Sequence, residues 1–459
     1  MFPSALRRTL PALILMAVSV HGCGPRPTGP PEGPNVLLLV VDTLRPDAIA
    51  TYGGHPAVAP TLDSLAATGI VFDDLFSQAP WTRPAMAALL SSRYPSEVGI
   101  DDGGTLYVMQ GLPETVPYLP EVFSEAGYAV RAVQCNPNLK VWTGFARGFD
   151  TYDFIAESER TEFRSRAEAV LDSLCAGERP FFYYLHVMEP HLPYLNHPDL
   201  PPPELPAPPS TGYRPDVIWR DVLASPNLSN ELKDHIRRTY LRDVRFGDVW
   251  LGKFFARLRA AGQGDRTLVC VISDHGEEHW EHGGVEHGHT LHREVLQIPG
   301  ILVLPRENPG AAPPRRVSST SRLTDIGPTL LELAGLPPLA GQRGRSLLPL
   351  LEDPGLHWDL EPTLAEGMLY GEQERALITP GWKLIRDLST GEESLYDLTQ
   401  DPQENVNLLA GPEAPAIWPT LRATLDSLVE TAQPPADSVL VPMDEKTRRE
   451  LKSLGYLGT

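Results

Sequence analysis

The sequence predicts an α/β fold: a central, largely parallel sheet with helices on both faces, plus a smaller C-terminal antiparallel sheet with a helix. Two patterns support this class. Apolar runs with the length of buried strands alternate with helical patterns over most of the chain, which is typical of parallel sheets. Beyond about residue 350 the pattern changes to short strand-like pieces separated by turns, which indicates hairpins.

The predicted elements follow one another in a regular order. The first strand covers 36–41, and helices follow at 60–68 and 82–90. The next units are a helix at 119–126, a strand at 129–133, a helix at 163–175, a strand at 181–187, a helix at 232–260 and a strand at 267–273. In the C-terminal part, 376–385 and 393–397 predict a hairpin, and 443–458 predicts an amphipathic helix stopped by Gly455.

Acidic and imidazole side chains follow two of the predicted buried strands. Asp42 ends the first strand, and Asp274 and His275 close the strand at 267–273. Ligands of open α/β sheets collect at the carboxyl ends of parallel strands, although a single strand-terminal Asp can also cap the next helix. Two carboxylates with one imidazole suit Ca²⁺, Mg²⁺ or Mn²⁺, and Zn²⁺ is also possible.

The segment from Ser77 to Pro95 resembles the nucleophile segment of the sulfatases, whose pattern is C/S-x-P-x-R. Thr82 stands at the nucleophile position and Pro84 matches, whereas Met86 replaces the Arg of the family. Sulfatases oxidise the Cys or Ser to formylglycine, and a Thr is not expected to undergo that oxidation. In the wider alkaline phosphatase superfamily, an unmodified Thr is the nucleophile of phosphodiesterases and of phosphoethanolamine or phosphoglycerol transferases.

Further segments extend this resemblance over nearly the whole chain. The segment 40–47 has Asp42 as the leading metal ligand and Thr43 in place of a second Asp. The segment 180–194 presents a substrate-contacting His191, and in 273–292 His287 aligns with a Lys of many relatives. Two further matching segments are 324–337 and 395–402. The Gly-Lys-Trp-His-Leu-Gly signature, whose Lys and His hold sulfate, is replaced by 127–140. Asn136 or Asn138 could supply one hydrogen bond there, although Asn-Pro-Asn is also ordinary turn chemistry.

The resemblance implies an alkaline-phosphatase-like fold and one divalent metal ion, held by Asp42, Asp274, His275 and the Thr82 oxygen. It further implies that His191 and His287 contact the transferring group or protonate the leaving group. In the segment that replaces the family signature, Asn136 is the residue expected to contact the substrate. The remaining histidines between 275 and 292 are expected at the surface or behind the site. They are His279, His282, His289 and His292.

The predicted function is therefore metal-dependent hydrolysis of a sulfate or phosphate ester, with Thr82 as the nucleophile. The substrate is expected to be a small-molecule, glycan or lipid ester. Phosphodiesters or phosphonate esters are expected to exceed aryl sulfates, because the formylglycine residue, the family Arg and the sulfate-holding Lys are all missing. A phosphoethanolamine- or phosphoglycerol-type transferase and a non-catalytic anion-binding homologue are the alternatives.

Composition and charge agree with an enzyme of this kind. The chain has 459 residues, and 59 acidic against 39 basic residues give a net charge of −20, which argues against nucleic-acid binding. The 48 prolines concentrate in 24–34, 198–215 and 305–314, which predicts linkers and loops. The expected organisation is a signal peptide at 1–23, a linker at 24–34, a catalytic domain at 35–350 and a C-terminal subdomain at 351–459.

The first 23 residues predict export. Arg7 and Arg8 precede an apolar stretch at 10–20 that is too short to span a bilayer, and 20–23 resembles a lipobox with Cys23 as the lipidated residue. We therefore expect a periplasmic or outer-surface lipoprotein of a bacterial envelope, touching the membrane only through its anchor; a secreted protein is the alternative. Cys135 and Cys175 could pair after export, but their spacing does not decide this.

Overall fold

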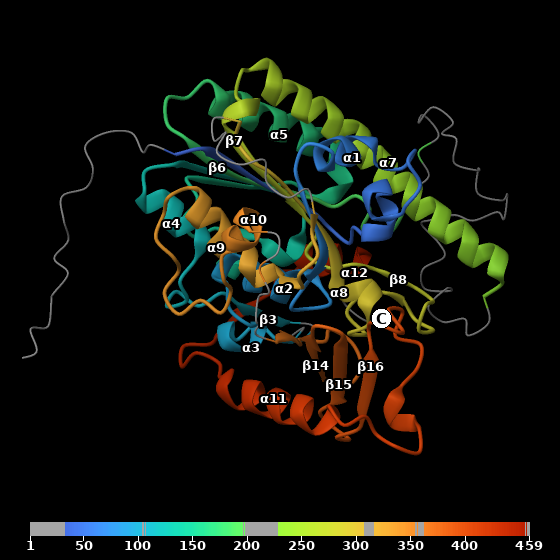
Figure 1. Ribbon diagram of the computed structural model, residues 1–459. Coiled ribbons are helices and arrows are strands. Elements are labelled where there is room, and N and C mark those ends of the chain that lie inside the picture. The colour runs from blue at the N-terminus through green and yellow to red at the C-terminus, as the bar shows by residue number, and fades with distance from the viewer. Residues whose placement is uncertain are drawn as a thin grey trace, which may run out of the picture.

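The computed structural model describes residues 33–102, 105, 107–195, 197, 228–306, 316–353, 356, 362–454 and 456. The signal segment, Cys23 and most of the predicted linkers lie outside the described residues. A twisted central sheet runs through the larger part of the molecule (Figure 1), in the order β11-β2-β10-β7-β1-β6-β4-β5, with β12 also paired to β2. Its strands are β1 (Asn35–Val41), β2 (Ile70–Phe76), β4 (Ala129–Gln134), β5 (Thr151–Phe154), β6 (Phe181–Val187), β7 (Thr267–Ile272), β10 (Gln297–Val303), β11 (Arg316–Val317) and β12 (Ser321–Arg322).

The sheet is largely parallel, as predicted. β1 pairs in parallel with β6 and β7, and β4 with β5 and β6, whereas β10 runs antiparallel to both β2 and β7. All seven residues of β1 are buried, because side chains point alternately to the two faces of the sheet and both faces are covered.

Helices cover each face of the sheet. Leu37 and Leu39 of β1 belong to the core shared with α1 (Pro60–Ala66), α5 (Arg160–Cys175) and α7 (Asn230–Ala260). Val36 and Leu38 belong to the opposite core, which is shared with α2 (Thr82–Ser91), α4 (Leu119–Glu125), α9 (Leu323–Leu333) and α10 (Leu348–Glu352). Figure 1 shows the two groups of helices on opposite sides of the strands, which confirms the predicted class.

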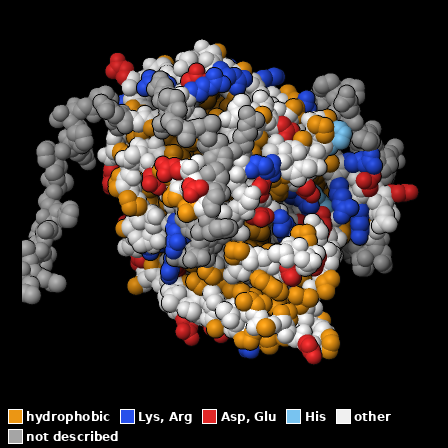
Figure 2. Space-filling view, viewed as in Figure 1, with side chains coloured by type: hydrophobic (Ala, Val, Ile, Leu, Met, Phe, Trp, Pro, Cys, Tyr) orange, Lys and Arg blue, Asp and Glu red, His pale blue; other side chains and the backbone are white. Residues whose placement is uncertain are grey.

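A four-stranded antiparallel sheet forms the smaller C-terminal part. Its order is β13 (Thr363–Ala365), β14 (Glu374–Thr379), β15 (Trp382–Asp387) and β16 (Glu393–Asp397), and α11 (Trp418–Thr431) covers it. Leu377, Leu384 and Leu395 pack with Leu421 and Leu425 of the helix. Figure 2 shows charged side chains of both signs scattered over the face in view, while hydrophobic side chains gather over the region of this sheet.

The chain then returns to the larger part of the molecule. β17 (Val439–Pro442) pairs with β3 (Val108–Gly111) in a separate two-stranded sheet, and α12 (Glu445–Ser453) follows after Asp444, whose side chain accepts a hydrogen bond from the Thr447 amide. Helix α12 ends at Ser453, close to the predicted stop at Gly455, and the side chain of Tyr456 beyond it is buried. The return therefore carries residue 456 to the edge where Asp42 lies.

Short elements complete the described part. They are η1 (Pro46–Ala48), η2 (Ala50–Tyr52), α3 (Pro95–Val98), η3 (Pro137–Leu139), η4 (Val141–Thr143), η5 (Glu157–Glu159), η6 (Gly264–Arg266), β8 (Glu278–His279), β9 (Val285–Glu286), α8 (Arg293–Leu296) and η7 (Leu408–Ala410). Within the described ranges, no helix combines the length and the apolar character needed to cross a bilayer. Cys135 and Cys175 do not form a disulfide with each other, and Cys270 is buried in β7.

A polar cluster joins the loop after β16 to the large domain. Glu404 accepts hydrogen bonds from Lys383 Nζ at 3.0 Å and from His292 Nδ1 at 2.9 Å. The His282 ring stacks on His292 with centroids 3.6 Å apart, and its two nitrogens face Glu294 Oε1 at 2.7 Å and the Glu404 carbonyl at 2.9 Å. Both nitrogens of His282 therefore donate, which requires the charged imidazolium.

This geometry makes stability depend on pH. Burial alone would lower the pKa of His282, but the hydrogen bond to Glu294 and the nearby carboxylates raise it to about 9. Because the folded protein holds this proton more tightly than the unfolded chain, the stabilisation is complete below about pH 6.5 and is lost as the pH rises towards 9. After a discount for solvent screening of this partly exposed group, we expect the free energy of unfolding to fall over this interval by on the order of 2 kcal/mol.

Urea unfolding at several pH values measures this effect. In the His282→Gln variant, most of the decrease in the free energy of unfolding between pH 6.5 and 9 should disappear. The His55→Gln variant, which changes an exposed histidine, should keep this decrease. An unchanged pH profile in His282→Gln would show that other groups cause the dependence.

Candidate active site

The carboxyl ends of β1, β6 and β7 bring the first polar residues together. The register pairs Val40 with His186 on one side and with Ile272 on the other, so that Asp42 and Asp274 leave neighbouring strands at the same edge. Asp42, Asp274 and His275 are completely buried. This confirms that the two strand ends meet, as their apolar runs predicted.

Thr82 lies at the first position of α2, next to this edge. Its Oγ1 is 3.5 Å from Asp42 Oδ2 and 3.3 Å from His275 Nε2. The preceding Trp81 is extended and its Nε1 donates to the Gly367 carbonyl at 2.6 Å, which fixes the start of the helix. The free amides of a helix N-terminus favour an anion, so the Thr82 hydroxyl lies where negative charge is stabilised.

The donor set around Thr82 fits a divalent cation. Among the described residues, Asp42 Oδ1 and Asp274 Oδ2 have no hydrogen-bond partner, although both carboxylates are buried. His275 Nδ1 lies 2.9 Å from the Gly276 carbonyl and donates to it, so that Nε2 carries the lone pair. That lone pair faces Asp42 Oδ1 at 3.6 Å and Asp274 Oδ2 at 3.5 Å. Three electron-rich atoms pointing at one another fit a cation between them.

His186 was not predicted, although it lies beside Asp42. Asp42, His186 and Asp274 offer atoms within 4.8 Å of one another and could hold a metal ion. However, Tyr184 Oη lies 2.6 Å from Nδ1 and Asp42 Oδ2 lies 2.9 Å from Nε2 of His186. The tyrosine hydroxyl can donate to Nδ1, so that Nε2 donates to Asp42. We therefore assign His186 to orienting Asp42, which leaves Oδ1 for the cation.

The electrostatics of the two aspartates differ. Burial alone would raise the pKa of Asp42, but the hydrogen bond from His186 and the charges of His191, His186 and His275 hold it well below its usual range. Burial and the neighbouring Asp42 charge raise the pKa of Asp274. A bound cation favours the ionised form of both carboxylates.

Asn136 forms the predicted turn and also faces Thr82, while its contact with the substrate stays a prediction. Its Oδ1 accepts from the Asn138 amide at 3.0 Å and so begins the turn η3. Its Nδ2 donates to Asp42 Oδ2 at 2.8 Å and to Thr82 Oγ1 at 3.0 Å. Asn138 accepts from Arg83 Nη2 at 2.9 Å instead. The turn therefore places a hydrogen-bond donor directly on Thr82.

His191 and His287 lie on the same side of the centre. Their ring centroids are 5.0 Å apart, and His287 lies 4.5 Å from the His275 ring. His191 Nδ1 faces the Leu192 carbonyl at 2.6 Å, which leaves Nε2 directed into the centre. Burial and the charges of His275 and His191 lower the pKa of His287 well below its usual value.

Tyr456 is the second residue that sequence reasoning missed. Its Oη is 3.0 Å from Thr82 Oγ1, 2.9 Å from His191 Nε2 and 3.4 Å from Asn136 Nδ2. Burial and the Asp42 charge raise its pKa well above the usual value, so the phenol keeps its proton. The separation of 374 residues from Thr82 left no local signal for this contact.

Other positions explain the departures from the sulfatase pattern. Met86 of α2 is fully buried in the apolar core. Because methionine carries no charge, position 86 lacks the positive charge of the family Arg. Lys140 forms an ion pair with Glu450 of α12 and donates to Thr447 Oγ1 at 2.8 Å. His279 contacts Tyr194 Oη at 3.1 Å, and His289 pairs with Glu278 at 2.8 Å, which places both outside the Thr82 contacts described above.

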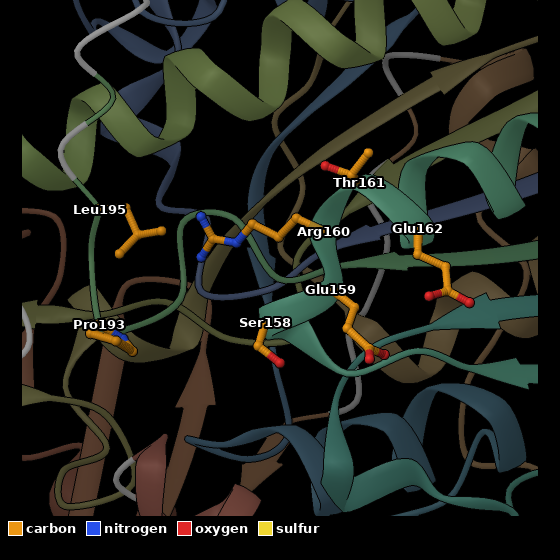
Figure 3. Close-up of a pocket in the computed structure, with 7 residues that line it drawn as sticks. All are labelled: Ser158, Glu159, Arg160, Thr161, Glu162, Pro193 and Leu195. Carbon is orange, nitrogen blue, oxygen red and sulfur yellow. The ribbon is translucent and has the colours of Figure 1, made fainter.

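A separate cavity of about 550 Å³ opens beside the segment that follows His191. Figure 3 shows Pro193 and Leu195 on one side of it, and Arg160 pointing across it from the start of α5. The remaining lining residues are Ser158, Glu159, Thr161 and Glu162. The cavity lining shares no residue with the contacts of Thr82 described above.

A match to the Sulfatase family model covers residues 34–336. The chain belongs to the sulfatase family. Residues 281–431 also match the model of the N-sulphoglucosamine sulphohydrolase C-terminal region. As a member of this family, whose fold is alkaline-phosphatase-like, the protein is a sulfatase-like ester hydrolase. The residues described above therefore form its candidate active site.

Relatives with known names cover most of the chain. A Delta 4,5-hexuronate-2-O-sulfatase of Bacteroides thetaiotaomicron is 25% identical over 456 residues, which covers 91% of this chain and 93% of the relative. Human iduronate 2-sulfatase is 24% identical over 403 residues, covering 71% and 72%. The crystal structure of a phosphonate monoester hydrolase of Agrobacterium radiobacter superimposes with a TM-score of 0.68 at 20% identity, covering 86% and 95%.

Proposed function

We propose that this sulfatase-family protein is a metal-dependent hydrolase in which the unmodified Thr82 hydroxyl is the nucleophile. One observation carries the proposal: Thr82 Oγ1 lies within 3.5 Å of Asp42 and His275, at the N-terminus of α2. Asp42, Asp274, His275 and Thr82 would hold one divalent ion. When bound, that ion supplies a Lewis acid that favours the ionised hydroxyl and neutralises charge on the transferring group.

The side chains around Thr82 suggest how the reaction runs. Asn136 Nδ2 points at Thr82 Oγ1 and can stabilise negative charge on it. Once the Thr82 hydroxyl proton has passed to solvent water, a bond forms from Thr82 Oγ1 to phosphorus or sulfur while the bond to the leaving alcohol breaks. The alcohol oxygen takes a proton from His191 Nε2 when that imidazole is protonated.

The covalent ester on Thr82 must then be cleaved. A formylglycine hydrate has a second hydroxyl that expels sulfate, whereas Thr82 has only one oxygen on its side chain. Water therefore attacks the phosphorus or sulfur atom, His287 accepts the water proton, and the Thr82 oxygen leaves and regains a proton. This two-step course needs no oxidised residue.

The substrate class follows from this difference. We propose phosphodiesters or phosphonate esters as the preferred substrates, and the structural likeness to phosphonate monoester hydrolases supports this choice. A sulfated sugar is the second candidate, because a relative that matches 91% of this chain is a Delta 4,5-hexuronate-2-O-sulfatase. Export as a lipoprotein through residues 1–23 and Cys23 remains a prediction.

A substrate panel tests the proposal. The purified protein is assayed with sulfate monoesters, phosphate monoesters, phosphodiesters and phosphonate esters of the same alcohol, each with Ca²⁺, Mg²⁺, Mn²⁺ or Zn²⁺. We expect kcat/KM for a phosphodiester or phosphonate ester to be highest. Faster hydrolysis of the sulfate ester than of every phosphorus ester would contradict the proposed substrate class.

We also expect no formylglycine at position 82. The oxidation starts from Cys or Ser, and Thr82 would give a ketone. Mass spectrometry of the peptide around Thr82, from protein expressed with a sulfatase-maturing enzyme, should show an unmodified Thr. A mass loss corresponding to a carbonyl would overturn this part of the proposal, and the Thr82→Cys variant is the positive control.

A further inference from the structure

We propose that Tyr456 occupies the leaving-group subsite of the Thr82 centre, so that a ring-bearing ester binds only after helix α12 and Tyr456 withdraw. The inference rests on the proposed function, because it defines the subsite relative to Thr82 and His191. It adds a substrate class and a means of regulation to the same site.

The position of the phenol oxygen carries the first step. Tyr456 Oη lies 3.0 Å from the proposed nucleophile and 2.9 Å from His191 Nε2, the proposed acid. A reacting ester must place its phosphorus or sulfur atom about 3 to 3.5 Å from the nucleophile. Its leaving oxygen must lie within hydrogen-bonding distance of the acid. Tyr456 Oη therefore fills the space that these atoms need.

The other polar neighbours of Thr82 are fully buried. Asp42, Asn136 and His275 surround Oγ1 on the side of the ligand set, and each of them is 0% exposed. Thr82 itself is 0% exposed, and Tyr456 is 4% exposed. Among these neighbours, Tyr456 is the side chain that can move without dismantling the ligand set.

The shape of the subsite indicates the alcohol that it accepts. The Tyr456 ring lies 6.3 Å from the Trp81 ring, 5.4 Å from His191 and 5.6 Å from His287, measured between centroids. A six-membered ring carrying one exocyclic oxygen therefore already fits between these side chains. An aryl ester or a sugar-ring ester has the same outline.

The attachment of this segment bears on the cost of its withdrawal. Its buried side chains are Thr447, Leu451, Leu454 and Tyr456, and Lys140 binds Thr447 and Glu450. A short segment near the end of the chain opens at a fraction of the free energy of global unfolding, because it buries far less apolar surface than the central sheet. The segment can therefore open while the large sheet stays folded.

The test compares Tyr456→Ala and Tyr456→Phe with the wild type in the full chain. Tyr118→Phe is the control, because it removes a buried hydroxyl that bonds the Phe145 carbonyl in the opposite core. Calorimetry with inorganic phosphate and the activating metal measures binding. Hydrolysis of the phenyl and the ethyl ester of one phosphonate measures turnover, and circular dichroism confirms folding.

We expect Tyr456→Ala to bind phosphate at least about 10-fold more tightly than the wild type, because the competing phenol is gone. The Tyr456→Phe variant should show a smaller gain, and Tyr118→Phe none. The gain in kcat/KM for Tyr456→Ala should be larger for the phenyl than for the ethyl ester.

Other outcomes separate the two proposals. If the wild type turns over esters and folded Tyr456→Ala binds phosphate no better or reacts more slowly, the subsite proposal is wrong while the Thr82 mechanism stands. Equal gains for the phenyl and ethyl esters would contradict the ring-shaped subsite. If no variant, wild type included, binds phosphate or hydrolyses any ester with any metal, the proposed function itself is wrong.

Discussion

Replacing Thr82 by alanine is expected to lower kcat/KM for ester hydrolysis by at least about 1000-fold, because it removes the atom that forms the covalent intermediate. The side chain is buried beside Asp42 and His275, so no solvent-held nucleophile takes its place without rearrangement. Steady-state assays on the best phosphorus ester measure the loss.

Thr329→Ala is the matched control for this substitution. Thr329 is a buried helical threonine whose hydroxyl donates to the Asp325 carbonyl, in α9. Thr329→Ala should lower the free energy of unfolding by about as much as Thr82→Ala does. It should leave kcat/KM within a few-fold of the wild type. Full activity of Thr82→Ala would refute Thr82 as the nucleophile.

The Asp274→Ala variant is expected to lose the metal ion. Two of the four proposed ligand side chains are carboxylates, and Asp274 Oδ2 has no hydrogen-bond partner within the described residues that could explain its burial. Removing it should weaken metal binding at least about 100-fold and abolish activity at low metal concentration. Elemental analysis after gel filtration should find one ion per wild-type chain and far less in the variant.

Asp248→Asn serves as the control for losing a buried carboxylate. Asp248 accepts hydrogen bonds from the Thr61 and Leu62 amides at the start of α1. This variant should keep its metal ion. A wild-type protein without any bound ion under saturating Ca²⁺, Mg²⁺, Mn²⁺ and Zn²⁺ would contradict the metal proposal.

The sequence predicted the parts of the site that depend on strands and on local motifs. Asp42 and Asp274 follow apolar runs, and parallel strands with such runs meet at one edge. Thr82, His191 and His287 came from the resemblance to the sulfatases. The structure places all five around one centre.

Contacts between segments far apart in the sequence could not be predicted in the same way. His186 sits inside an apolar strand, and only the register of β6 against β1 brings it to Asp42. A histidine inside a buried strand was the available signal. Tyr456 reaches Thr82 because β17 pairs with β3 and α12 packs against the turn at Asn136, which no short pattern encodes. The side chain of Asn136 both begins a turn, through its bond with the Asn138 amide, and donates to Thr82 Oγ1.

A mass measurement of the protein quenched during turnover tests the central claim most directly. Wild-type enzyme is mixed with a phosphodiester or phosphonate ester, denatured in acid within the first turnovers and digested. The mass of the peptide that contains Thr82 is then measured by mass spectrometry. The account predicts the mass of the phosphoryl or phosphonyl group on Thr82, absent from Thr82→Ala. Turnover with a permanently unmodified Thr82, or an adduct on another residue, would contradict it.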